Sequence, residues 1–254
     1  MTIKAIAGGQ VIAEVSGEGS PLTVLLHGWG RDRRDVVGLA DGLVGTVAAF
    51  DLPGFGSASA PPDVWGAREY ARVVGDAIDD MRRVAHARSD EVVVFGHSFG
   101  GRVAICLAAT THVRGIVLSG VPLLRLGPRP KPSLAFRLAR GMNRLRLLSD
   151  SRMEQVRQKR GSADYRAASG VMRGVLVRTV GESYEDELRR VRCSVRLVWG
   201  QLDSAASVAV AQQATTYLGA PFELVVIDGA DHDVHRSHPE AVRRAILDLS
   251  DAKG

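Results

Sequence analysis

The chain has 254 residues, of which 45% are hydrophobic and 24% charged, a composition typical of soluble globular proteins. This length suits one α/β domain, or one domain with an insertion. No stretch approaches the roughly 18 consecutive apolar residues of a membrane span. The first residues also lack the basic region and long apolar run of a signal peptide. We therefore expect a cytoplasmic protein without stable membrane association.

The basic residues are unevenly distributed. The formal net charge of +5 raises the question of nucleic-acid binding. Only four of the 33 basic residues are lysines, which is typical of an arginine-favouring coding bias. Residues 122–192 hold 17 basic and 7 acidic residues, a net charge of +10, whereas the rest of the chain carries −5. We therefore expect no nucleic-acid partner. It stays open whether the basic segment serves an anionic substrate, an acidic lipid surface or neither.

Apolar runs alternate with helical patterns in the first 121 residues. Residues 65–85 repeat apolar positions three and four apart, as an amphipathic helix does. Runs such as 91–96 show no polar alternation, which indicates strands of a parallel sheet that is buried on both faces. Strands are predicted at 21–28, 46–54, 91–96 and 114–122, and helices at 35–45, 65–85 and 100–111.

This alternation stops at Pro122. A proline-rich stretch and basic helical patterns at 137–150 and 163–180 follow, before strands at 193–203 and 221–232 and helices at 207–219 and 238–251 restore it. Ser237 and Glu240 fit the S-x-x-E capping box at the start of the last helix. We predict a mostly parallel central sheet of about eight strands with helices on both faces, formed by residues 1–121 and 191–254. Residues 122–190 are predicted to form a helical cap inserted after the sixth strand.

A glycine-flanked serine stands between a predicted strand and a predicted helix. Gly96-His97-Ser98-Phe99-Gly100 fits G-x-S-x-G in the context that this motif requires. The serine would occupy a sharp turn, and side chains at positions 96 and 100 would collide where strand and helix cross. The N-terminal N–H groups of the helix favour negative charge developing near the serine. Ser98 is therefore the candidate nucleophile.

A serine nucleophile needs a base and an acid that orients the base. In a parallel sheet both are expected on loops beyond the carboxyl ends of later strands. His232 follows the last predicted strand and a small-residue turn, and Asp203 follows the strand before it. We predict His232 as the base and Asp203 as the acid, because the strand ending near residue 120 is followed by no carboxylate.

Other acids and a metal site are weaker alternatives. Asp51 is interpreted as an acceptor that braces its own loop. Asp228, Asp231 and Asp233 are too close to His232 in sequence to orient its ring. The acidic and histidine residues at 231–238 could suggest a metal, but no second ligand cluster and no H-E-x-x-H helix accompany them. We expect no metal and no other cofactor.

A tetrahedral intermediate requires two N–H donors. The backbone N–H of Phe99 is one candidate, and the tight turn at His27-Gly28 offers the N–H of Trp29 as the other. His27 itself is interpreted as a residue that braces the loop backbone. The substrate-binding candidates are His27, Gly28, His97, Phe136, Met142, Met172 and Leu176.

Together these motifs resemble the α/β-hydrolase superfamily over nearly the whole chain. The resemblance rests on His27-Gly-Trp-Gly30, Asp51-Leu-Pro-Gly-Phe-Gly56, Gly96-His-Ser-Phe-Gly-Gly101, Trp199-Gly-Gln-Leu-Asp203 and Gly229-Ala-Asp-His232. The order serine, acid, histidine is the one that this superfamily uses. The resemblance is to its capped esterases and C–C bond hydrolases. Serine at position 98 argues against the branches that use an aspartate nucleophile.

We expect a cofactor-free serine hydrolase that cleaves an ester-type carbonyl of a small-molecule substrate, as a monomer or a homodimer. Hydrolysis of a C–C bond next to a ketone by the same residues is the first alternative. A non-catalytic ligand-binding protein on the same fold is the second.

Overall fold

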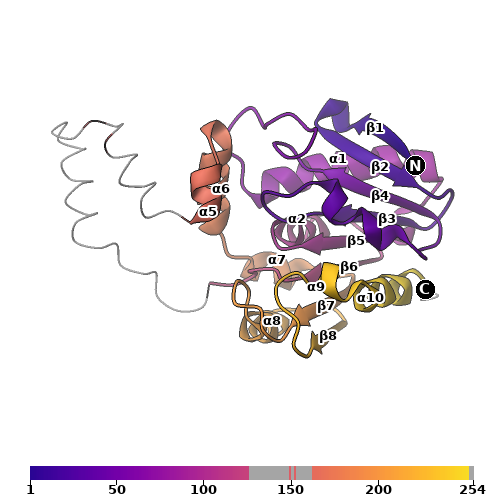
Figure 1. Cartoon of the computed structure of the whole chain (residues 1–254). Helices are drawn as coiled ribbons and strands as arrows, with labels where there is room; N and C mark the ends of the chain where they lie inside the picture. The colour runs from indigo at the N-terminus through magenta and orange to yellow at the C-terminus, as the bar shows by residue number, and fades with distance from the viewer. Residues whose placement is uncertain (126–148, 150–151, 153–161, 252–254) are drawn as a thin grey trace.

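The computed structural model describes residues 1–125, 149, 152 and 162–251 of the chain. An eight-stranded sheet forms its centre, in the order β1-β2-β4-β3-β5-β6-β7-β8 (Figure 1). The strands are β1 (Thr2–Ile6), β2 (Val11–Ser16), β3 (Leu22–Leu26), β4 (Thr46–Asp51), β5 (Val92–His97), β6 (Gly115–Ser119), β7 (Ser194–Gly200) and β8 (Phe222–Ile227). The helices are α1 (Ala67–Ala85), α2 (Phe99–Ala108), α5 (Ala163–Ala167), α6 (Gly170–Val180), α7 (Glu185–Arg190), α8 (Val208–Thr215), α9 (Val234–Ser237) and α10 (Pro239–Asp251).

The sheet is mostly parallel. Strands β3 to β8 pair in parallel, while β2 pairs antiparallel with both β1 and β4. In the parallel pairing of β3 with β5, Leu26 faces Gly96, so the loops after these two strands leave the sheet side by side. The carboxyl ends of β3, β5, β7 and β8 therefore open at the same edge, which is where ligands bind in such sheets.

Helices cover both faces of the sheet. Along β5, Val92 and Val94 pack into the hydrophobic cluster that includes α1 and α2, whereas Val93 and Phe95 pack into the cluster that includes α10. All four side chains are fully buried. Burial on both faces explains why β5 shows no polar alternation. The predicted fold class is confirmed for the sheet and its two helical layers.

Two local predictions differ from the structure. The helix expected at 35–45 is replaced by two 3-10 turns, Arg33–Asp35 and Val37–Ala40, because glycines interrupt the apolar pattern of this segment. The capping box is also wrong: the Ser237 hydroxyl donates to the Asp233 carbonyl and closes α9, and α10 starts at Pro239. The predicted strand at 221–232 is present as β8, which lies at the sheet edge with Phe222 46% exposed.

Helices α5, α6 and α7 occupy the chain between β6 and β7. Helix α7 packs against α2, and α6 is tied to the start of α1 by Arg178, which donates to the Val64 carbonyl and to Glu69 at 2.7 and 2.6 Å. In Figure 1, α5 and α6 stand beside the sheet rather than on either face of it. A cap spanning 122–190 stays a prediction. Over the described residues, no helix is both long and apolar enough to cross a membrane.

Candidate active site

Ser98 occupies a strained turn between β5 and α2. Its backbone angles are φ 48° and ψ −106°, in a region that non-glycine residues seldom adopt and that is common at functional sites. The neighbouring glycines permit the turn. A Cβ on Gly96 would lie 2.6 Å from the Gly100 carbonyl oxygen, and a Cβ on Gly100 would lie 2.5 Å from the Leu26 carbonyl oxygen. The predicted collision at these two positions is therefore confirmed.

The loop after β7 holds Asp203 in one orientation. Its Oδ1 accepts hydrogen bonds from the backbone N–H groups of Ala205 and Ala206, both at 2.8 Å. Its Oδ2 lies 2.8 Å from Nδ1 of His232. Because an ionised carboxylate only accepts hydrogen bonds, the proton of the neutral imidazole is placed on Nδ1. Nε2 of His232 then carries the lone pair that can take up a proton.

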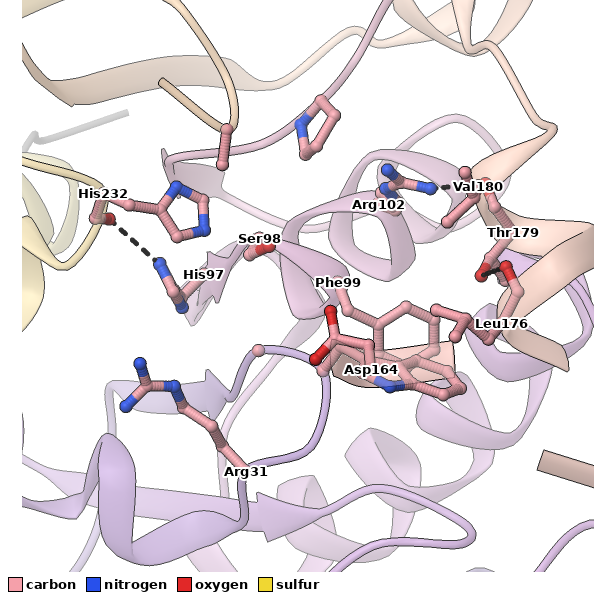
Figure 2. A pocket seen from close by; sticks show the side chains of 14 residues that line it. Arg31, His97, Ser98, Phe99, Arg102, Asp164, Leu176, Thr179, Val180 and His232 are labelled. Atoms are coloured by element: carbon pink, nitrogen blue, oxygen red, sulfur yellow. Dashed lines mark hydrogen bonds between the residues drawn. The ribbon is translucent and has the colours of Figure 1, made fainter. Parts of the chain in front are cut away.

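Ser98 and His232 line the same cavity of about 350 Å³. Figure 2 shows a ring nitrogen of His232 on the side of Ser98, with no hydrogen bond drawn between them. Contacts of this kind are often long in the absence of substrate and shorten when it binds. The structure thus brings all three predicted residues, Ser98, Asp203 and His232, to one place.

The backbone N–H groups of Trp29 and Phe99, the two predicted oxyanion donors, belong to residues that line the cavity beside Ser98. Trp29 follows β3, Phe99 is the first residue of α2, and both line the cavity. Among the described backbone contacts, neither N–H has a carbonyl partner. The Trp29 and Phe99 rings pack edge to face with centroids 5.4 Å apart, and Phe55 and Tyr70 pack around them. This aromatic packing, which the sequence did not predict, fixes both backbone segments.

A buried polar network lies beneath His232. Nε2 of His97 donates to the His232 carbonyl at 3.1 Å, and the His97 and His235 rings lie with centroids 4.1 Å apart and planes tilted by 36°. His235 contacts Asp35 at 3.0 Å. Arg31 donates to both Asp35 and Asp233, at 2.9 and 2.7 Å. These contacts connect the loops after β3, β5 and β8, so they hold the loop that carries His232.

Within the described part of the chain, Asp35, His97 and His235 form a group whose possible ligand atoms all lie within 4.8 Å of one another. Nε2 of His97 is already bonded to the His232 carbonyl and Nε2 of His235 to Asp35, so both nitrogens are used within the protein. The Asp35 carboxylate also forms an ion pair with the Arg31 guanidinium. The arrangement therefore suits hydrogen bonding better than cation binding.

Burial of two histidines predicts a loss of stability in mild acid. Burial lowers the pKa of His97 well below its ordinary value, and the charges of His235 and His232 lower it further. Burial also lowers the pKa of His27. Below about pH 6.5 these histidines become protonated in the unfolded chain but stay neutral in the folded protein. The unfolding free energy should therefore fall by up to about 1.4 kcal/mol per pH unit for each histidine. The loss should be absent above that pH.

Chemical denaturation between pH 5 and 8 measures this effect, in a range above the titration of ordinary carboxylates. His97→Gln should flatten the slope, whereas His112→Gln, at an exposed position, should leave it unchanged. Equal slopes in wild type and His97→Gln would show that His97 is not responsible.

Only some of the predicted substrate-binding residues line the cavity. Gly28, His97 and Leu176 line the cavity. His27 is fully buried outside the lining; its Nδ1 donates to the Gly28 carbonyl and its Nε2 accepts from the Leu52 N–H. Met172 packs on Gly54 and Tyr70 instead. Phe136 and Met142 lie outside the described residues.

The loop-bracing interpretation of Asp51 is confirmed. The side chain is fully buried and accepts from the backbone N–H groups of Arg33 and Ser57, both at 2.8 Å. Sequence reasoning did not identify several other cavity residues, namely Arg31, Arg102, Pro122, Asp164, Thr179, Val180 and Ala205. Only Arg102 carried a usable signal, because it follows the serine by one helical turn.

The structure combines a mostly parallel sheet, a strained serine at a strand-to-helix turn and a histidine–aspartate pair on later loops. This combination is typical of hydrolases with the α/β-hydrolase fold. The chain belongs to the alpha/beta hydrolase family, whose sequence pattern matches residues 23–245. The predicted membership is therefore confirmed. A search of curated protein sequences finds no match.

Solved structures with the same fold include enzymes of several activities. An esterase from Thermogutta terrifontis is 19% identical, with 98% of this chain and 97% of that one covered and a TM-score of 0.68. A monoacylglycerol lipase from Paleococcus ferrophilus is 20% identical, with full coverage of both chains and a TM-score of 0.67. A meta-cleavage product hydrolase from Pseudomonas fluorescens IP01 is 16% identical, with 98% and 97% covered and a TM-score of 0.64. At these identities the likeness concerns the fold.

Proposed function

We propose that the protein is a serine hydrolase that cleaves an ester-type carbonyl of a small molecule. The observation that carries the proposal is the bond between Asp203 and His232 next to Ser98. With Oδ1 of Asp203 held by two backbone N–H groups and Oδ2 bonded to Nδ1, the free Nε2 of His232 is the base that this chemistry needs.

The proposed reaction has two halves. His232 accepts the Ser98 proton as the serine oxygen attacks the carbonyl carbon, and the Trp29 and Phe99 N–H groups stabilise the oxyanion. Collapse of the intermediate breaks the ester bond, and His232 gives its proton to the departing alcohol. A water molecule, deprotonated by His232, then attacks the acyl-serine and releases the acid.

Labelling with a fluorophosphonate probe tests the proposal. The wild-type protein should gain the mass of one probe at Ser98 and should hydrolyse short p-nitrophenyl esters, while Ser98→Ala should do neither. Tight ligand binding with no labelling and no turnover of any substrate would instead favour a non-catalytic binding protein.

C–C bond hydrolysis is the second candidate, and one of the solved structures with the same fold is the meta-cleavage product hydrolase from Pseudomonas fluorescens IP01. Dienol–ketone substrates separate the two reactions. Faster turnover of these than of p-nitrophenyl esters, with labelling at Ser98 retained, would replace the ester by the C–C bond and leave the assigned residues in place.

A further inference from the structure

The cavity beside Ser98 is lined by three described residues with formal charges: Arg31, Arg102 and Asp164. They differ in whether an oppositely charged side chain of the protein pairs with them. Arg31 is paired with both Asp35 and Asp233, so its guanidinium serves the network beneath His232. Arg102 and Asp164 form no ion pair with any described residue, and neither is paired with the other. These two charges are the ones available to a bound molecule.

Arg102 lies one helical turn beyond the serine. Its backbone N–H donates to the Ser98 carbonyl at 3.3 Å, so the two residues share a face of the first turn of α2. Figure 2 shows His232 and Arg102 on opposite sides of Ser98 in that view. The Arg102 side chain is half-buried and donates to the Thr179 carbonyl of α6. The guanidinium is therefore held at the cavity wall rather than free in solvent.

This contact leaves most of the guanidinium donors unused. The group has five N–H donors in a planar fork, and the described residues supply one acceptor, a neutral carbonyl. Carboxylates and phosphates both complement such a fork in geometry and charge, and the singly charged carboxylate suits a cavity that is also lined by Asp164. Leu176 and Val180 form an apolar part of the same cavity, which suits the hydrocarbon portion of a substrate.

We propose that Arg102 binds a free carboxylate of the substrate, so that the protein hydrolyses esters of monoanionic compounds. This inference rests on the hydrolase function proposed above and adds the substrate class to it. Asp164 limits the negative charge of the substrate, because its carboxylate would repel a second substrate carboxylate on its side of the cavity. Selection thus comes from a residue of the core helix α2, in addition to whatever the basic segment 122–192 contributes.

Matched esters test the proposal. One series consists of p-nitrophenyl esters whose acyl chains have equal length and end in a carboxylate, a methyl group or a trimethylammonium group. A second series places the carboxylate on the alcohol, as in 3-acetoxybenzoate against phenyl acetate. In one of the two series, kcat/KM should favour the carboxylate by about 10- to 100-fold, as expected for a charge-assisted hydrogen bond.

Substitutions assign the preference to its residue. Arg102→Met should bring the ratio of carboxylate to neutral ester close to 1, and Arg102→Lys should keep an intermediate ratio because it retains the charge but not the fork. Arg125→Met is the matched control. It removes an exposed arginine whose Nη1 donates to the Val180 carbonyl at 3.2 Å, at the same end of α6 but outside the cavity lining, and should leave the ratio unchanged.

Three results would overturn the inference while the hydrolase function stands. They are labelling at Ser98 with equal kcat/KM for carboxylate and neutral esters, a carboxylate preference that persists in Arg102→Met, and a preference for the trimethylammonium ester that Asp164→Asn abolishes. By contrast, the absence of both labelling and turnover with every ester would refute the hydrolase proposal itself. The ratio is compared within each variant, so a general loss of activity on substitution does not mimic the expected result.

Discussion

Asp203→Asn is expected to lower kcat by about 10⁴-fold, as the corresponding change does in a serine protease with a Ser-His-Asp triad, while the protein stays folded. The reason lies in the two backbone N–H groups of Ala205 and Ala206 that Oδ1 binds. An asparagine must direct its single oxygen toward them, so its NH₂ group faces Nδ1 of His232. Nδ1 must then accept a hydrogen bond, which places the ring proton on Nε2. In that tautomer His232 cannot take the proton of Ser98.

The measurement is ester hydrolysis and the rate of fluorophosphonate labelling, alongside the melting temperature. Asp228→Asn is the control: it makes the same chemical change at an exposed residue after β8, and kcat should stay within about twofold. Comparable kcat in Asp203→Asn and wild type would place the acid elsewhere. A large loss of melting temperature would show that the variant tests folding rather than chemistry.

Gly96→Ala is expected to have the largest effect on stability. Its Cβ would lie 2.6 Å from both the Gly100 carbonyl oxygen and the Gly101 Cα, and backbone atoms cannot rotate away as a side chain can. Either β5 or the start of α2 must shift. We expect the free energy of unfolding to fall by about 3 kcal/mol, which in a protein of this size lowers the melting temperature by about 6–12 °C.

Thermal and denaturant unfolding measure this loss. Gly219→Ala is the matched control, since among the described residues no heavy atom beyond its two chain neighbours lies within 4 Å of a Cβ at that position. It should change the melting temperature by no more than about 2 °C. The shifted turn should also slow labelling of Ser98 in Gly96→Ala. A variant with unchanged melting temperature and labelling rate would mean that the crossing of strand and helix relaxes without cost.

Local sequence signals predicted the fold class because they act over short distances. The apolar runs of the parallel strands reflect burial on both faces, as Val92–Phe95 show. The glycines around Ser98 reflect a turn whose geometry involves neighbouring residues. Where a local rule failed, tertiary contacts were the cause. Ser237 closes α9 instead of capping α10.

The candidate site could be predicted for residues that directly follow the carboxyl ends of the parallel strands. Since the carboxyl ends of parallel strands share an edge, the strands before Asp203 and His232 indicated that both residues would lie near Ser98. The cavity lining was less predictable, because it depends on which helices pack over that edge. Thr179 and Val180 of α6 reach the cavity, whereas Met172 of the same helix turns toward Gly54 and Tyr70.

The sequence by itself therefore determined the parallel sheet, the sharp turn at Ser98 and the order in which serine, acid and histidine follow one another. The sheet and the turn depend on residue type and spacing within single strands and turns, and the order of the three residues is read directly along the chain. Only the tertiary structure decided how each side chain is used. It holds Asp203 by two backbone N–H groups, places His97 under the His232 carbonyl 135 residues away, and pairs Arg31 with carboxylates while leaving Arg102 with a neutral carbonyl. Hydrogen bonds and ion pairs between distant segments depend on distances that only the folded chain establishes.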